Sequence, residues 1–264
     1  MTDVLLGTVA IEPNRWGTVS PDRRPVTRLD DWLVPIAEAG FDGLEVWDRH
    51  LLEATSDDVD SVLSGPLPVT VFNSYADFGP GAAAEEERRI AAVWAERTGS
   101  RAVKFNVGND PDQESAYVER LSQWVDDLPT TTAALCECHQ GISIAEDPTV
   151  AARILEAAGP PGRAQALVHT HDAPDLVRAK FDAYGARIAH VHVNFLDFAA
   201  MAHPTLGSVA DELRAFVELV RSLGFAGSWT LEFVAGLLTD RDTPAALVDQ
   251  ATVDLPVLRA ALAD

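Results

Sequence analysis

The sequence is short of positive charge. Its 264 residues include 20 Lys and Arg against 41 Asp and Glu, which gives a formal net charge of −21 at pH 7. Nucleic acids and anionic membranes bind proteins through clusters of basic side chains, and this chain has few basic residues to offer. We therefore predict that neither nucleic acid nor a membrane surface is a partner.

Cysteine is equally scarce. Cys136 and Cys138 are the two cysteines, and they stand two residues apart on a predicted strand, where they cannot easily pair. No stretch of 18 residues is uniformly apolar, and the first residues lack the basic region of a secretory signal. We expect a cytoplasmic protein with free thiols and no membrane span.

What the sequence does contain is a repeating unit in which an amphipathic helix ends in glycine and a short apolar strand follows. The glycines are Gly40, Gly99, Gly159, Gly185 and Gly224. Strands are predicted over 4–10, 43–47, 68–73, 102–106, 133–138, 165–169, 187–194 and 228–233. Helices are predicted over 27–39, 51–63, 82–97, 113–126, 148–158, 174–183, 209–223 and 243–263.

Eight strands that alternate with eight helices predict an α/β fold with a parallel sheet. A chain of 264 residues has the usual size of a single (β/α)₈ TIM barrel, so we predict one such domain over residues 1–264. The rival is a doubly wound open sheet. That fold usually has a glycine-rich phosphate loop after its first strand, and residues 7–10 do not form one.

The strand over 187–194 is the most informative of the eight. Its two-residue period places His190, His192 and Asn194 on one face, opposite Ile188 and two valines. A solvated strand face usually carries threonine, lysine or glutamate rather than two imidazoles and an amide. We therefore expect this face to be one wall of a polar pocket.

Other polar residues gather where predicted strands end, and in a TIM barrel these ends carry the chemistry. Glu45, Glu137, His169 and Glu232 all occupy such positions. A buried carboxylate is costly unless it is paired or bound to a cation. Each histidine alone is typical of a hydrogen-bonded core residue, and Glu45 alone of a salt bridge. The joint pattern favours a divalent metal site, with ligands that suit Mn²⁺, Co²⁺, Fe²⁺ or Zn²⁺ better than Ca²⁺.

Four motifs on these strands resemble those of the xylose isomerase-like TIM-barrel superfamily, the sugar phosphate isomerases and epimerases. They are residues 40–47, 135–141, 190–194 and 230–233. The resemblance covers nearly the whole chain. It implies one divalent metal ion, Mn, Co, Fe or Zn with Mg as an alternative, held by Glu137, a residue of the sixth strand, His192 and Glu232.

The sixth strand departs from the family pattern. The family usually has Asp-x-x-His there, whereas this chain has His169, Thr170, His171 and Asp172. The ligand position then falls on His169, and Asp172 takes the position of the family's histidine. A shift in register would make His171 or Asp172 the ligand instead. Histidine in place of aspartate makes the site less anionic, which leaves the activity and the preferred metal open.

The leading hypothesis is a metal-dependent isomerase or epimerase of a small sugar or keto-polyol, which acts through an enediolate. The resemblance implies Glu137 and Glu232 as the catalytic acids and bases. Substrate-binding residues are predicted as well: Trp16, Glu45, His50, Lys104, His139, Asp172 and Asn194. The same intermediate could expel a leaving group, so a lyase, either a dehydratase or a keto-glycoside eliminase, is the alternative.

Three further alternatives stay open. Lys104 lies within a predicted strand and could form a Schiff base with a carbonyl substrate. A non-catalytic sugar-binding protein would bind the metal or the sugar without turnover. The superfamily also contains endonuclease IV-type repair nucleases, which the acidic composition disfavours. Barrels of this kind often pair through their outer helices, so a homo-oligomer is compatible with the sequence.

Overall fold

The strands close into a barrel. A computed structural model describes residues 2–197, 199–236, 238 and 242–263. The eight strands form a closed barrel in chain order, which confirms the predicted (β/α)₈ TIM barrel. The strands are β1 (Val4–Gly7), β2 (Gly43–Trp47), β3 (Val69–Asn73), β4 (Ala102–Phe105), β5 (Ala133–Cys136), β6 (Ala164–His169), β7 (Ile188–Val193) and β8 (Ser228–Leu231).

The helices follow the predicted order with two differences. They are α1 (Leu33–Ala39), α2 (Arg49–Leu52), α3 (Ser56–Leu63), α4 (Ala82–Thr98), α5 (Glu114–Asp127), α6 (Pro148–Ala158), α7 (Pro174–Tyr184), α8 (Ala210–Ser222) and α9 (Pro244–Ala263). The first predicted helix begins later, at Leu33, after a 3₁₀ turn over Leu29–Asp31. The second is two helices, because Thr55 caps α3 by accepting a hydrogen bond from the Asp58 amide.

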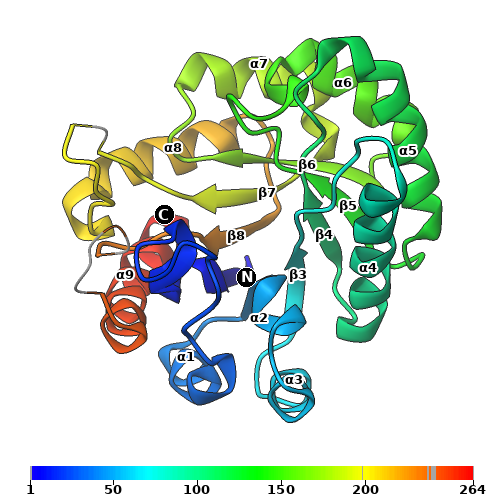
Figure 1. Ribbon diagram of the computed structural model, residues 1–264. Coiled ribbons are helices and arrows are strands. Elements are labelled where there is room, and N and C mark those ends of the chain that lie inside the picture. The colour runs from blue at the N-terminus through cyan, green and yellow to red at the C-terminus, as the bar shows by residue number, and fades with distance from the viewer. Residues whose placement is uncertain (1, 198, 237, 239–241, 264) are drawn as a thin grey trace. The chain divides into compact units, whose positions relative to one another are not determined.

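The contacts divide the chain into two compact units. The first unit comprises Met1–Val69, His169–His171 and Val191–Asp264, and the second comprises Thr70–Val168 and Asp172–His190. Within the second unit, helix α6 packs against both α5 and α7 (Figure 1). Within the first unit, α9 packs against both α1 and α8. The prediction of a single domain over the whole chain stays a prediction.

The predicted glycines lie at helix ends, but not all of them take the left-handed conformation. Gly40 and Gly99 follow α1 and α4 with φ values of 101° and 64°, a left-handed conformation that glycine adopts without strain. Gly185 has a φ of −53° and begins the 3₁₀ turn Gly185–Arg187 instead. A glycine follows α7 as predicted, but the left-handed conformation is absent there because the chain continues its right-handed turn.

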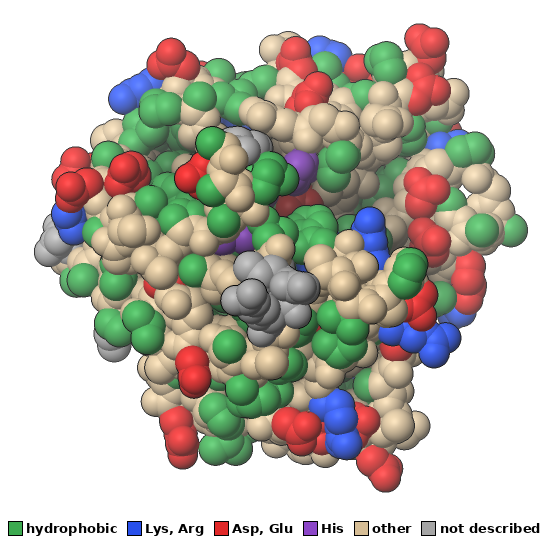
Figure 2. Space-filling view, turned by 60° about the vertical axis from the view of Figure 1, so that its left-hand side comes forward, with side chains coloured by type: hydrophobic (Ala, Val, Ile, Leu, Met, Phe, Trp, Pro, Cys, Tyr) green, Lys and Arg blue, Asp and Glu red, His purple; other side chains and the backbone are tan. Residues whose placement is uncertain are grey.

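The surface bears out the acidic composition. Asp and Glu side chains are spread over the face drawn in Figure 2, with fewer Lys and Arg side chains among them. Among the residues that the structure describes, no helix combines the length and the apolar character that a bilayer crossing requires.

Candidate active site

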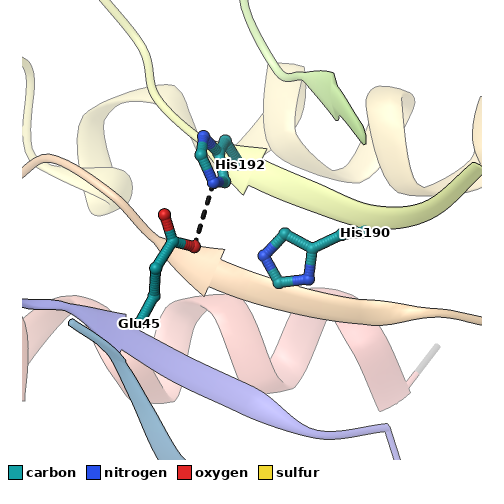
Figure 3. A group of neighbouring side chains, drawn as sticks. All are labelled: Glu45, His190 and His192. Atoms are coloured by element: carbon teal, nitrogen blue, oxygen red, sulfur yellow. Dashed lines mark hydrogen bonds and ion pairs between the residues drawn. The ribbon is translucent and has the colours of Figure 1, made fainter. Parts of the chain in front are cut away.

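His192 is the centre of a buried acidic cluster in the first unit. It belongs to β7, and its side chain is fully buried. Its Nε2 lies 3.0 Å from Oε2 of Glu45 on β2, a contact that the dashed line in Figure 3 marks. Its Nδ1 lies 3.2 Å from Oε1 of Glu232, which directly follows β8. Strands far apart in sequence thus place one imidazole between two carboxylates.

The two carboxylates control the protonation of His192. Burial by itself disfavours the imidazolium, but Glu232 and Glu45 outweigh burial and raise the pKa of His192 to about 10. Near neutral pH the imidazole is therefore charged, and it balances one of the two carboxylates. The cluster keeps an excess negative charge, which a bound cation would neutralise.

Two more histidines lie beside His192 in the first unit. The His169 and His192 rings meet edge to face with their centroids 5.3 Å apart, and their ligand atoms belong to one group within 4.8 Å. His171 stacks on His169 with the ring centroids 4.7 Å apart. His169 is 2% exposed, whereas His171 is half-buried. Of the predicted ligands, His169 and Glu232 are thus each neighbours of His192, and His171 stacks on His169.

Asn194 fixes the second oxygen of Glu232. Its Nδ2 donates a hydrogen bond to Glu232 Oε2 at 3.0 Å, while its backbone N–H donates to Thr170 Oγ1 at 2.8 Å. His190 and His192 are 2% and 0% exposed, and the predicted polar pocket along this face of β7 stays a prediction. Asn194 therefore holds the carboxylate, and its predicted contact with substrate stays a prediction.

Glu137 lies in the second unit, where two neighbours hold its carboxylate. Lys104 Nζ is 2.9 Å from Oε1, and Asn106 Nδ2 donates to Oε2 at 2.6 Å. Lys104 is 3% exposed and Glu137 is 5% exposed. A buried ammonium next to the carboxylate favours its ionised form. The geometry suits a general base, while the catalytic and metal-binding roles of Glu137 stay predictions.

The chain leaves strand geometry directly after Glu137. Cys138 has a φ of 51°, so the two-residue alternation of a strand does not extend from Glu137 to His139. His139 is half-buried and its Nδ1 lies 2.7 Å from the carbonyl oxygen of Gln140. The thiols of Cys136 and Cys138 are free and buried, as expected. Substrate binding by His139 stays a prediction.

Asp172 forms a buried ion pair within the second unit. Its Oδ2 lies 2.7 Å from Nζ of Lys180 on α7, and both side chains are 1% exposed. The contact directs the carboxylate toward the helix layer, which gives Asp172 a structural task. Its predicted contact with substrate and its alternative role as a metal ligand remain untested predictions.

The loop between β1 and α1 is fastened to the barrel by Glu12, which is fully buried. The Glu12 carboxylate accepts hydrogen bonds from the backbone N–H groups of Asn14, Val26 and Thr27. It also lies 3.0 Å from Nε2 of His50. Burial alone would raise the pKa of Glu12, but the hydrogen bonds from His50 and the backbone outweigh it and hold the pKa below its usual value.

His50 has both ring nitrogens engaged in this anchor. Its Nδ1 lies 2.8 Å from Thr8 Oγ1, which in turn accepts a hydrogen bond from the Trp47 amide. The His50 side chain is fully buried. This network gives His50 a structural role, and its predicted role in substrate binding stays a prediction.

The anchored loop carries Trp16, which is 40% exposed. Its ring centroid lies 5.7 Å from that of Phe233, the residue after Glu232. The Arg15 guanidinium lies between two indoles, 4.9 Å from the ring of Trp16 and 5.0 Å from that of Trp47. Trp16 thus packs against Phe233 and Arg15, and its predicted contact with a sugar stays a prediction.

Two residues of these networks, Glu12 and Asn106, were missed by the sequence reasoning, as was the buried Asn73. Asn73 ends β3 and Asn106 follows β4, so the rule that polar residues gather at strand ends could have found both. Glu12 gave no such signal, because its partners come from a loop that has no periodic pattern.

In sequence, the chain matches no protein-family model and no curated protein. In structure, its closed barrel is similar to solved (β/α)₈ barrels that include a xylose isomerase domain protein, so the fold that the resemblance implied is confirmed.

Three solved structures illustrate this likeness. A xylose isomerase domain protein from Alicyclobacillus acidocaldarius has a TM-score of 0.67 at 17% identity and covers 99% of both chains. The 3-keto-D-glucoside 4-epimerase YcjR from E. coli has a TM-score of 0.64 at 17% identity, over 98% of this chain and 100% of its own. The probable 3-DHS dehydratase AsbF from Bacillus anthracis has a TM-score of 0.66 at 14% identity, over 98% of this chain and 99% of its own.

Proposed function

We propose that this protein is a divalent-metal-dependent isomerase or epimerase of a small sugar or keto-polyol. The observation that carries the proposal is the buried His192 imidazole between the carboxylates of Glu45 and Glu232. The names of two structural neighbours, a xylose isomerase domain protein and a 3-keto-D-glucoside 4-epimerase, support a sugar-modifying enzyme on this barrel.

The donor set fits such a metal. Buried imidazole nitrogens and carboxylate oxygens suit Mn²⁺, Co²⁺, Fe²⁺ or Zn²⁺, and Mg²⁺ remains an alternative. In this proposal His169, His192 and Glu232 hold the ion, together with Glu137 as the resemblance implies. A bound cation would act as a Lewis acid on a substrate carbonyl.

Glu45 has a positioning role in this scheme. A metal-ligating histidine usually donates its second ring N–H to a carboxylate, which fixes the ring and its tautomer. Glu45 Oε2 lies 3.0 Å from Nε2 of His192 and so meets this requirement. Nδ1, the nitrogen that faces Glu232, is then the ligand atom. We therefore propose that Glu45 positions His192 rather than binding the substrate.

Glu232 and Glu137 are the proton-transfer groups of the proposal. One of them takes a proton from the carbon next to the substrate carbonyl, which gives an enediolate. Return of a proton to the neighbouring carbon gives the isomer, and return to the opposite face of the same carbon gives the epimer. Asn194 and His192 hold Glu232, while Lys104 and Asn106 hold Glu137. Such placement makes each carboxylate an effective base.

Metal content of the purified protein tests the site. We expect about one Mn, Co, Fe or Zn ion per chain by elemental mass spectrometry, and loss of that ion in His192→Ala. The matched control is His50→Gln, which alters the other buried Glu–His pair and should keep the ion. Equal content in His192→Ala and the wild type, or none in either after reconstitution, would refute the metal site.

Exchange of a carbon-bound proton tests the reaction. The metal-loaded protein, incubated in D₂O with a panel of ketoses and keto-glycosides, should place deuterium on the carbon next to the carbonyl of its substrate. Nuclear magnetic resonance measures the incorporation. Incorporation that is the same in the wild type and in Glu232→Gln would show that Glu232 is not the base.

A lyase is the second candidate, and two observations favour it. The probable dehydratase AsbF has a similar fold, and His169 stands where the isomerase pattern has aspartate. The same proton abstraction would then be followed by loss of a group from the next carbon. Product analysis separates the candidates, because a lyase gives an unsaturated product and an isomerase does not.

A Schiff-base enzyme is the weakest candidate. The Lys104 ammonium forms an ion pair with the Glu137 carboxylate at 2.9 Å, which keeps the amine protonated and so less nucleophilic. Borohydride trapping with a carbonyl substrate should give no adduct at Lys104. A covalent adduct at this residue would overturn the metal mechanism in favour of the Schiff base.

A further inference from the structure

Asn73 and Lys104 stand side by side on neighbouring strands of the second unit. They are register partners at the ends of β3 and β4. On β3, Phe72 stacks on Trp94 of helix α4. On β4, Phe105 has an edge-to-face contact with a tryptophan of α5. Since Phe72 and Phe105 face the helices, strand alternation directs Asn73 and Lys104 to the barrel interior.

Asn73 carries an acceptor that lacks a donor. Its side-chain oxygen is buried and accepts no hydrogen bond among the residues that the structure describes. The residue is 1% exposed. Native proteins rarely bury a polar atom without a partner, and one at the mouth of a barrel indicates a ligand group. The missing group must be a hydrogen-bond donor.

Lys104 supplies donors at the neighbouring position. Its ammonium has three N–H groups, and one carboxylate oxygen of Glu137 lies 2.9 Å from Nζ. The charges of Lys104 and Glu137 cancel, so this part of the interior offers no net positive charge to a phosphate. An acceptor beside a donor, with no net charge, matches a hydroxyl group, which both donates and accepts.

We propose that Asn73 and Lys104 bind one hydroxyl group of a neutral, polyhydroxylated substrate. The hydroxyl donates to Asn73 Oδ1 and accepts from Lys104 Nζ. This inference deepens the proposed function and rests on it for the identity of the reaction, since it names a free sugar or polyol rather than a phosphate ester as the substrate. Binding itself requires no turnover and is measured separately.

Isothermal titration calorimetry tests the pair with defined probes. These are xylitol, ribitol and D-arabinitol, their 2-deoxy and 3-deoxy forms and their 5-phosphates, each titrated into metal-loaded and metal-free protein. We expect the wild type to bind at least one pentitol and to bind one of its deoxy forms about 10-fold to 100-fold more weakly. Asn73→Ala should bind the parent about as weakly as that deoxy form.

Two further variants test the proposed hydroxyl site. Ser74→Ala is the matched control, because Ser74 is the buried neighbour of Asn73 and its hydroxyl donates to the backbone oxygen of Lys104. This variant should keep the affinity of the wild type. Lys104→Met should lose selectivity in the same way as Asn73→Ala, so the test stands even if Asn73→Ala does not fold.

The inference is overturned if no pentitol binds, if Asn73→Ala binds the parent as the wild type does, or if a 5-phosphate binds more tightly than its pentitol. The two proposals fail separately. Pentitol selectivity that depends on Asn73, without any deuterium exchange, would reject the proposed function alone. Exchange on a sugar that is unaffected by Asn73→Ala would reject the hydroxyl site alone.

Discussion

Two buried Glu–His pairs of the first unit have the same length but different surroundings. His50 Nε2 lies 3.0 Å from Glu12, and His192 Nε2 lies 3.0 Å from Glu45. The second ring nitrogen of His50 meets a threonine hydroxyl, whereas that of His192 meets another carboxylate. The pair distance therefore does not reveal the role of a pair. The role depends on the groups that surround the pair.

The Glu12 pair is complete as it stands. Backbone N–H groups from three residues satisfy the carboxylate, so burial of its charge is compensated within the loop. The Glu45 pair is not complete, because a second carboxylate, Glu232, leaves an excess negative charge in a buried place. The first arrangement fastens a loop, and the second is suited to hold a cation.

The largest expected effect is the loss of turnover when Glu232 is replaced. Glu232→Gln keeps the size of the side chain and removes its basicity, so turnover should fall by about 10²-fold to 10⁴-fold while the fold survives. Steady-state kinetics and circular dichroism measure the two quantities. Glu12→Gln is the comparison and should keep most of the turnover. If Glu232→Gln were as active as the wild type, the Glu45–His192–Glu232 cluster would have no more part in turnover than the Glu12–His50 pair.

The next effect concerns metal affinity. Glu45→Gln weakens the support of His192, and loss of such a partner typically costs about 10-fold to 100-fold in affinity. Competition with a chelating dye measures the dissociation constant. His50→Gln should leave this constant unchanged. Equal losses in both variants would mean that the effect is a general loosening of the barrel.

The Glu12 pair should act on stability instead. Glu12→Gln removes charged hydrogen bonds, which should lower the free energy of unfolding by about 1.5–3 kcal/mol near neutral pH. The pKa of Glu12 is lower in the folded protein than its usual value of 4.5. The difference from the wild type should therefore be full above about pH 4.5 and shrink as the pH falls through the folded pKa. Urea denaturation at several pH values tests this, and a difference that grows toward acid would contradict it.

The smallest expected effect is the release of a proton from His192 when the metal binds. The pKa of His192 is raised to about 10, so at pH 7 its imidazole must lose a proton before it can ligate a metal. Titration of metal-free protein with Zn²⁺ in weak buffer should release about one proton per ion, as measured with an indicator dye. His192→Ala, which should not bind the ion, should release no proton in the same titration. Metal binding by the wild type without proton release would show that a charged His192 is not a ligand of the ion.

Part of this site was predictable from single strands. His190 and His192 share a face because alternation is a local property of a strand, and Glu232 could be placed at a strand end for the same reason. The rule failed at His139, because Cys138 takes a left-handed backbone conformation that no periodic pattern announces. Glu12 was not predicted at all, since its partners lie 2, 14, 15 and 38 residues away along the chain.

The sequence by itself determined the barrel, the order of its elements and the polar ends of its strands, because these follow from periodicity and from the turn preferences of single residues. Only the tertiary structure decided what each polar side chain meets. It gave His192 two carboxylates, Asp172 a lysine and His50 a loop anchor. The reason is physical: local pattern sets the face of a strand, whereas closure of the chain sets the neighbours of a buried charge and hence its protonation.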